Sequence, residues 1–77
     1  MPMQKMGERF VDAFLDYADH HGHVEVRKRV EAAKAAKVPL IQIVLVILPY
    51  AIAAFSGQPV DFQKLIADIL ALLNQQP

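Results

Sequence analysis

The stretch that decides the fold is VPLIQIVLVILPYAIAAF, residues 38–55, which lies between Lys37 and the Ser56-Gly57 pair. No Asp, Glu, Lys, Arg or His occurs from Val38 through Val60. Such a run must be surrounded by apolar material, either protein or lipid, because burying its side chains away from water is strongly favourable. The surroundings of this segment are therefore the first question about the molecule.

Three interpretations of residues 38–55 compete. The β-branched residues of LIQIVLVIL favour a strand buried on both faces, but no second strand-like segment occurs in the chain to pair with it. A core helix would need cover on all sides, which other subunits could supply. A membrane helix is the interpretation we favour, because the 17 residues from Pro39 to Phe55 would extend ~26 Å, close to the thickness of a bilayer's hydrocarbon core.

Two residues within the run qualify the membrane interpretation. Pro49 predicts a kink, which membrane helices tolerate. Tyr50 needs a polar partner at that depth, so Pro49 and Tyr50 are candidate contacts with a partner helix.

The remaining composition narrows the class of protein. With 77 residues and no cysteine, the chain forms one domain at most and has neither disulfides nor cysteine-bound zinc to stabilise it. The formal net charge is zero, but most charged residues precede Val38. A charged first half followed by an apolar second half is unusual for an isolated globule of this length.

Five basic residues come shortly before the apolar run, and this bias predicts that the N-terminal side faces the cytoplasm or the interior of an assembly. They are also candidate contacts for lipid headgroups or, without sequence specificity, for nucleic-acid phosphates. A solvated helix face is the alternative. The five residues are Arg27, Lys28, Arg29, Lys34 and Lys37.

The first 37 residues predict two helices. Apolar residues recur at helical spacing over residues 4–21, and the His20-His21-Gly22 sequence suits a helix end. Residues 23–37 are rich in alanine and only weakly apolar, which favours a second helix with a thin packing face.

A turn at residues 56–59, Ser-Gly-Gln-Pro, separates the apolar run from an amphipathic helix within the last segment, residues 60–77. We expect this helix over residues 60–73, too short and too polar to be a second membrane span. Its apolar stripe is a candidate interface with the central helix or with a neighbouring subunit. The stripe comprises Phe62, Leu65, Ile66, Ile69, Leu70 and Leu73.

Candidate groups for chemistry are few. Asp16, His20 and His23, with Asp19 and His21 nearby, could supply metal ligands, because imidazole and carboxylate suit divalent ions. Gly22 is expected to end the helix before His23, so a solvated helix end is the preferred interpretation. The sequence has no nucleophile–histidine arrangement and no glycine-rich phosphate loop, so we expect neither catalysis nor a cofactor.

Together these features predict an all-α small membrane protein with N-terminal amphipathic helices, one Pro-kinked apolar span and a C-terminal amphipathic helix. The expected function is that of a non-catalytic structural or accessory subunit, whose partners are the lipid bilayer and other subunits or copies of itself. Two alternatives remain open. One is a membrane-permeabilising protein of the holin or small-toxin kind, and the other is a soluble helical oligomerisation module.

Overall fold

Four helices make up most of the chain between residues 3 and 75, the part that the computed structural model describes, and this part contains no strand. They are α1 (Met3–His20), α2 (Val24–Ala35), α3 (Leu40–Phe55) and α4 (Phe62–Asn74). The all-α prediction is confirmed, and the strand interpretation of residues 38–55 is wrong because α3 occupies that segment.

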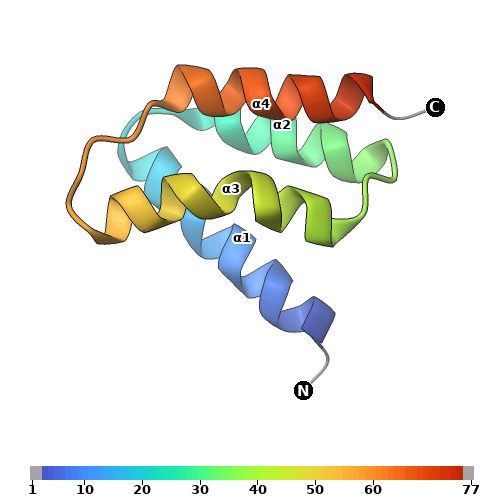
Figure 1. Cartoon of the computed structure of the whole chain (residues 1–77), viewed down its shortest axis with the longest axis horizontal. Helices are drawn as coiled ribbons and strands as arrows, with labels where there is room; N and C mark the ends of the chain where they lie inside the picture. Colours follow the sequence, from blue (N-terminus) through green and yellow to red (C-terminus); the bar gives the residue numbers. More distant parts are fainter. Residues whose placement is uncertain (1–2, 76–77) are drawn as a thin grey trace.

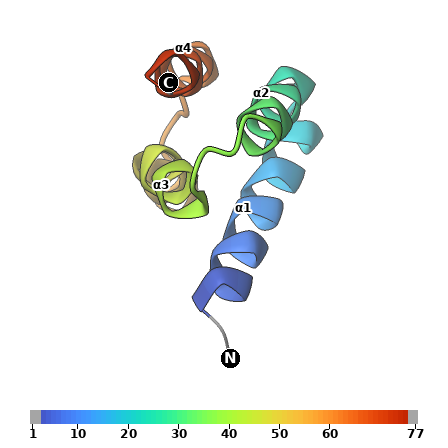
Figure 2. The same cartoon turned by 90° about the vertical axis from the view of Figure 1, so that its right-hand side faces the viewer.

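Three of the helices form one group, and the fourth crosses it (Figure 1). α2, α3 and α4 lie alongside one another, and α1 crosses them at an angle. In the end-on view, α4 lies at the top, above α3 and to one side of α2, whereas α1 descends from α2 on the side away from α4 (Figure 2). α3 therefore packs mainly on α1 and α4, and it touches α2 only slightly.

One apolar core joins all four helices. Each helix contributes the side chains of one stripe, as expected for amphipathic helices that share a core. Gly7 allows α1 to approach α3 closely, because a Cβ atom at that position would lie 3.2 Å from a methyl carbon of Leu40. The buried residues are Val11, Phe14, Leu15, Ala18, Val26, Val30, Ala33, Val38, Ile43, Ile47, Ala51, Phe62, Leu65, Ile69 and Leu72.

The apolar helix α3 is a packed element of this small fold. It has 16 residues, and no helix between residues 3 and 75 is long and apolar enough to cross a membrane. The membrane-spanning part of the predicted fold is therefore not supported. α3 continues through Pro49 as one helix. Proline has no N–H group, so the backbone carbonyl of Leu45, four residues earlier, loses its usual helical hydrogen bond. Leu45 lies on the exposed side of α3, where water can donate to that carbonyl.

Three of the four helices end in the same motif, in which a residue with positive φ turns the chain and two backbone N–H groups cap the helix. Gly22 and Gly57 occupy this position after α1 and α3, with φ of 81° and 72°. After α2 the position is taken by Lys37, with φ of 67°. There the N–H groups of Lys37 and Val38 donate to the carbonyls of Lys34 and Ala33, both at 3.0 Å.

The three caps generate a paired prediction. A side chain in the left-handed region costs roughly 1–2 kcal/mol, so Lys37→Gly should raise the free energy of unfolding by about 0.5 kcal/mol once the extra freedom of glycine in the unfolded chain is subtracted. Gly57→Ala should lower it by about 1 kcal/mol through the backbone alone, because nothing lies within 4 Å of an added Cβ. Urea unfolding of both variants at one protein concentration measures the two shifts, and shifts of equal sign would contradict the assignment.

A second pair tests the core. Val26 is fully buried, and Val24, one half-turn away on α2, is 55% exposed. We expect Val26→Ala to lower the free energy of unfolding by about 1–2 kcal/mol, from two lost methyl groups less the gain in helix propensity. Val24→Ala, the matched control, should change it by less than about 0.5 kcal/mol. The same urea experiment, followed by circular dichroism, would reject the proposed core if the two variants lost equal stability.

Candidate interaction surface

The outer face of α3 carries an unbroken row of large apolar side chains that the fold leaves in contact with solvent. We call these five residues the α3 stripe: Ile41 (58% exposed), Leu45 (59%), Leu48 (39%), Ile52 (56%) and Phe55 (82%). Soluble chains ordinarily scatter such residues singly, and a contiguous patch marks a contact site.

The α3 stripe exists because α3 is apolar around more of its circumference than the core covers. Ile43, Ile47 and Ala51 turn into the core, and they recur every four residues as a buried helix face requires. The stripe residues are centred about 120° further around the helix, on its solvent side, and are spaced alternately by four and three residues. The sequence contains this spacing, but the surrounding apolar residues conceal it until the fold shows which side is covered.

The apolar stripe of α4, the interface candidate from the sequence, faces inward. Phe62, Leu65 and Ile69 are buried in the core of the chain itself. The other three members, Ile66, Leu70 and Leu73, are half-buried. The structure thus uses the α4 stripe between its own helices, and the exposed apolar row lies on α3.

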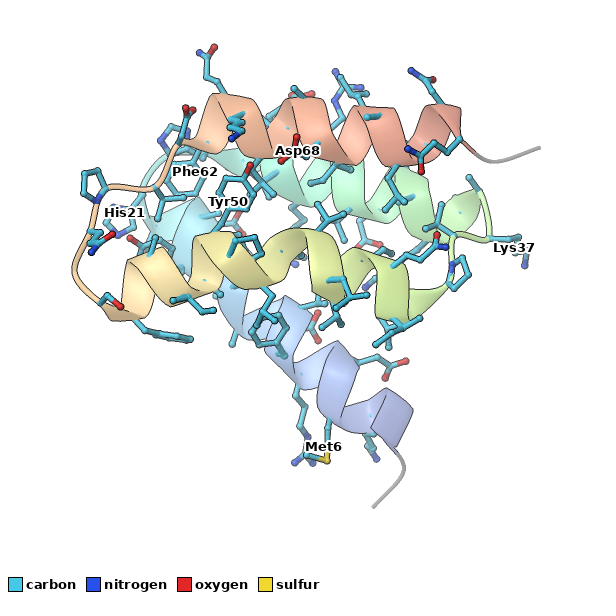
Figure 3. The ribbon with its side chains drawn as sticks, viewed as in Figure 1. Met6, His21, Lys37, Tyr50, Phe62 and Asp68 are labelled. Carbon is cyan, nitrogen blue, oxygen red and sulfur yellow. The ribbon has the colours of Figure 1, made fainter. Side chains whose placement is uncertain are left out.

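Tyr50 finds its polar partner within the chain. Its hydroxyl donates a hydrogen bond to the carboxylate of Asp68, which links α3 to α4 (Figure 3). Burial raises the pKa of Tyr50 to about 12, and the hydrogen bond and negative charge of Asp68 add to the rise. Pro49, the other predicted contact in the run, is exposed next to the α3 stripe.

The five basic candidates do not form one cationic patch. Arg27 donates from Nε to Asp19 and from Nη2 to Asp16, each at 2.9 Å, so it fastens α2 to α1. The hydrogen bond with Asp19 is the main reason that the pKa of Arg27 is raised.

Two more of these cations are paired within α2. Arg29 lies 2.9 Å from a carboxylate oxygen of Glu25, and Lys34 lies 3.7 Å from one of Glu31. Lys28 and Lys37 make no ion pair among residues 3–75 and remain exposed. Two free cations give a weaker attraction for headgroups or phosphates than the five counted in the sequence.

The three metal-ligand candidates are separated by other contacts. His20 donates from Nδ1 to the backbone carbonyl of Asp16 at 2.9 Å, while the Asp16 carboxylate pairs with Arg27. His23 stacks on Phe62, with ring centroids 4.0 Å apart. Among the described residues, no three His, Asp or Glu side chains converge in a way that could hold a metal ion.

Instead, the histidines help to build an aromatic junction where three helices meet. His21 packs on Tyr17 at 4.3 Å, and Tyr17 in turn lies 6.3 Å from Phe62 between ring centroids. Figure 3 places His21 and Phe62 together at one end of the molecule, opposite the end that carries Lys37. Stacked pairs of this kind stabilise a packed corner.

At the Lys37 end, an open groove of about 290 Å³ lies beside the α2–α3 turn. Its wall combines charged and apolar side chains. The lining residues are Glu8, Lys34, Lys37, Val38, Leu40 and Ile43.

Comparisons with protein families, with curated proteins and with solved structures find no match to this chain. The α3 stripe, defined from its own geometry, is therefore the feature on which we base a function.

The Tyr50–Asp68 pair yields a pH prediction. An unfolded tyrosine loses its proton near pH 10, whereas folded Tyr50 keeps it to about pH 12, so its contribution to stability is complete below pH 10 and is lost as the pH rises through 12. At pH 7 we expect Tyr50→Phe to reduce the free energy of unfolding by about 1 kcal/mol.

The loss of unfolding free energy in the Tyr50→Phe variant, relative to the wild type, should shrink between pH 10 and 11.5. Urea unfolding of both proteins at several pH values measures it. Tyr17→Phe is the control at pH 7, because the Tyr17 hydroxyl has no hydrogen bond within the described chain. It should lower the free energy of unfolding much less than Tyr50→Phe does. A deficit that stayed constant up to pH 11.5 would rule out the pair as the source.

Proposed function

We propose that this chain is a non-catalytic structural or accessory subunit that enters a larger assembly through the α3 stripe. The observation that carries the proposal is the row of five exposed apolar side chains on a helix without a single charge. A helix face of this kind is stable in water only at a cost, and that cost disappears when a partner covers it.

The size of the stripe supports a specific contact. The exposed fractions of its five side chains correspond to roughly 600 Å² of apolar surface, at the upper end of the largest patches on ordinary monomers. A standard protein interface buries ~800 Å² on each partner, so the stripe alone supplies most of the area of one.

The surroundings of the stripe have the composition of an interface border. Gln42, Pro49 and Ser56 lie exposed beside it on α3 and at its end, and all three are uncharged. Protein interfaces typically combine an apolar centre with a polar rim.

A second candidate follows from the same face. The most exposed residue of the stripe is Phe55, at the end of α3, and an aromatic ring at such a position suits the boundary of a lipid bilayer. In that case α3 would lie in the membrane interface, and the chain would serve as a membrane-associated accessory subunit or a membrane-permeabilising protein. Interfacial helices usually have a lysine- and arginine-rich opposite face, whereas the opposite face of α3 is buried in the core.

A matched pair of lysine substitutions tests the stripe. Leu45 and Val24 are similarly exposed, at 59% and 55%, but only Leu45 belongs to the stripe. We expect the wild-type chain to sediment as a species larger than the monomer, either when purified or in extracts of the cells that make it. Leu45→Lys should weaken this assembly about tenfold to a hundredfold, through ~1.5–3 kcal/mol of lost burial, and Val24→Lys should leave it intact.

Other outcomes separate the candidates. Flotation of the wild-type chain with phosphatidylcholine–phosphatidylglycerol vesicles, lost in Leu45→Lys but kept in Val24→Lys, would favour the membrane candidate. A wild-type chain that is monomeric both when purified and in native extracts, and that does not float with vesicles, would contradict both.

A further inference from the structure

We propose that a second copy of this chain covers the α3 stripe, with a two-fold axis that passes near Leu48. The inference rests on the proposed function and names the partner. A two-fold interface brings the same patch of both subunits together, so the patch must be complementary to itself. Two properties of the stripe meet this requirement, and the position of Lys28 on α2 favours a protein partner over a lipid surface.

The first property is the spacing. The stripe residues follow one another by four, three, four and three positions, the alternation that lets two helices interlock along a seam. Leu48 is the midpoint, because Ile41 and Phe55 each lie seven residues away. In a two-fold pair centred there, each Leu48 contacts its counterpart, and the row on one copy is matched in length by the row on the other.

The second property is the charge. From Val38 to Val60 no side chain is ionisable apart from the phenol of Tyr50, which turns to Asp68. Two identical faces that carried charges would place like charges opposite one another, which opposes pairing. This face avoids that repulsion completely, and it offers no charge by which a partner of opposite sign could recognise it.

The third observation is the position of Lys28, which makes no ion pair among residues 3–75. Lys28 follows the buried Val26 by two residues, which places it about 200° around α2 and away from the core on which α3 packs. Lys28 therefore points away from the fold, and its attraction for an anionic lipid surface does not reinforce contact through the stripe. A protein face that is itself apolar and uncharged fits the stripe better. The stripe of another copy is such a face, and another copy is present wherever this chain is made.

The extent of the surface agrees with a dimer. Roughly 600 Å² from the five side chains is close to the ~800 Å² per partner of a standard interface, and the exposed neighbours Gln42 and Pro49 add to it.

Because the natural chain has no cysteine, a single introduced thiol reports the contact without background. We expect Leu48→Cys, at low micromolar concentration under mild oxidation, to form a disulfide-linked dimer in high yield. Lys28→Cys is the matched control, since it places an exposed thiol on the outward side of α2, and it should remain mostly monomeric. Circular dichroism checks that both variants keep the helical fold.

A second measurement covers the case in which the thiol geometry prevents a disulfide. Sedimentation equilibrium of the purified wild-type chain should show a monomer–dimer equilibrium, with a dissociation constant that changes less than about threefold between 0.1 and 1 M NaCl because no charges meet. Ile52→Lys should weaken the dimer at least tenfold, and Val24→Lys should not.

Failure of this inference differs from failure of the proposed function. A purified chain that stays monomeric at 100 µM and forms no more Leu48→Cys disulfide than the Lys28→Cys control would overturn the second copy as partner. If that chain still enters a larger species in native extracts, and loses it with Leu45→Lys, the assembly function stands with a different protein as the occupant. Dimers equally abundant in Ile52→Lys would place the contact elsewhere and overturn the inference as well.

Discussion

The structure depends on how a helix without charges is covered by a short chain. α3 is apolar around most of its circumference, and only three other helices are available to shield it. α1 and α4 pack on two of its sides and α2 touches it only slightly, so the core residues Ile43 and Ile47 are buried while a continuous outer row is not. A chain of 77 residues buries a smaller fraction of its surface than a larger domain does, which agrees with the incomplete cover of α3.

Much of the architecture can be predicted from the sequence because its signals are local. The amphipathic stripes of α1 and α4 indicate helices directly, and Gly22 and Gly57 mark two of the helix ends. The end of α2 is harder to predict, because Lys37 adopts a backbone conformation that lysine rarely takes. There the buried side chain of Val38, which follows the turn, helps to hold the chain in place.

What the sequence cannot predict is which solvent or partner meets each face. A 17-residue apolar run has the same hydropathy whether it crosses a bilayer or packs one side on a core, and only the positions of α1 and α4 distinguish the two. The partner of Tyr50 is equally hidden, since Asp68 is 18 residues away and belongs to another helix. The sequence likewise does not show which charged side chains pair with one another. Arg27 is one of the five basic residues that come shortly before the apolar run, but the fold pairs it with Asp16 and Asp19.

Stability of the isolated fold does not explain the α3 stripe. Lysine, glutamate and glutamine are helix formers as good as leucine and better than isoleucine or phenylalanine, so polar residues at Ile41, Ile52 and Phe55 would preserve or improve the helix. They would also disturb the core little, because Ile41, Ile52 and Phe55 are already 58%, 56% and 82% exposed. One charge in the row would suffice to interrupt the patch and discourage association.

All five positions are nevertheless large and apolar, in the one spacing that suits a helix seam. A surface from outside the monomer would bury these side chains, and this is the basis of the proposal that α3 meets a second copy. The spacing, the absence of charge and the area of the stripe support that proposal together.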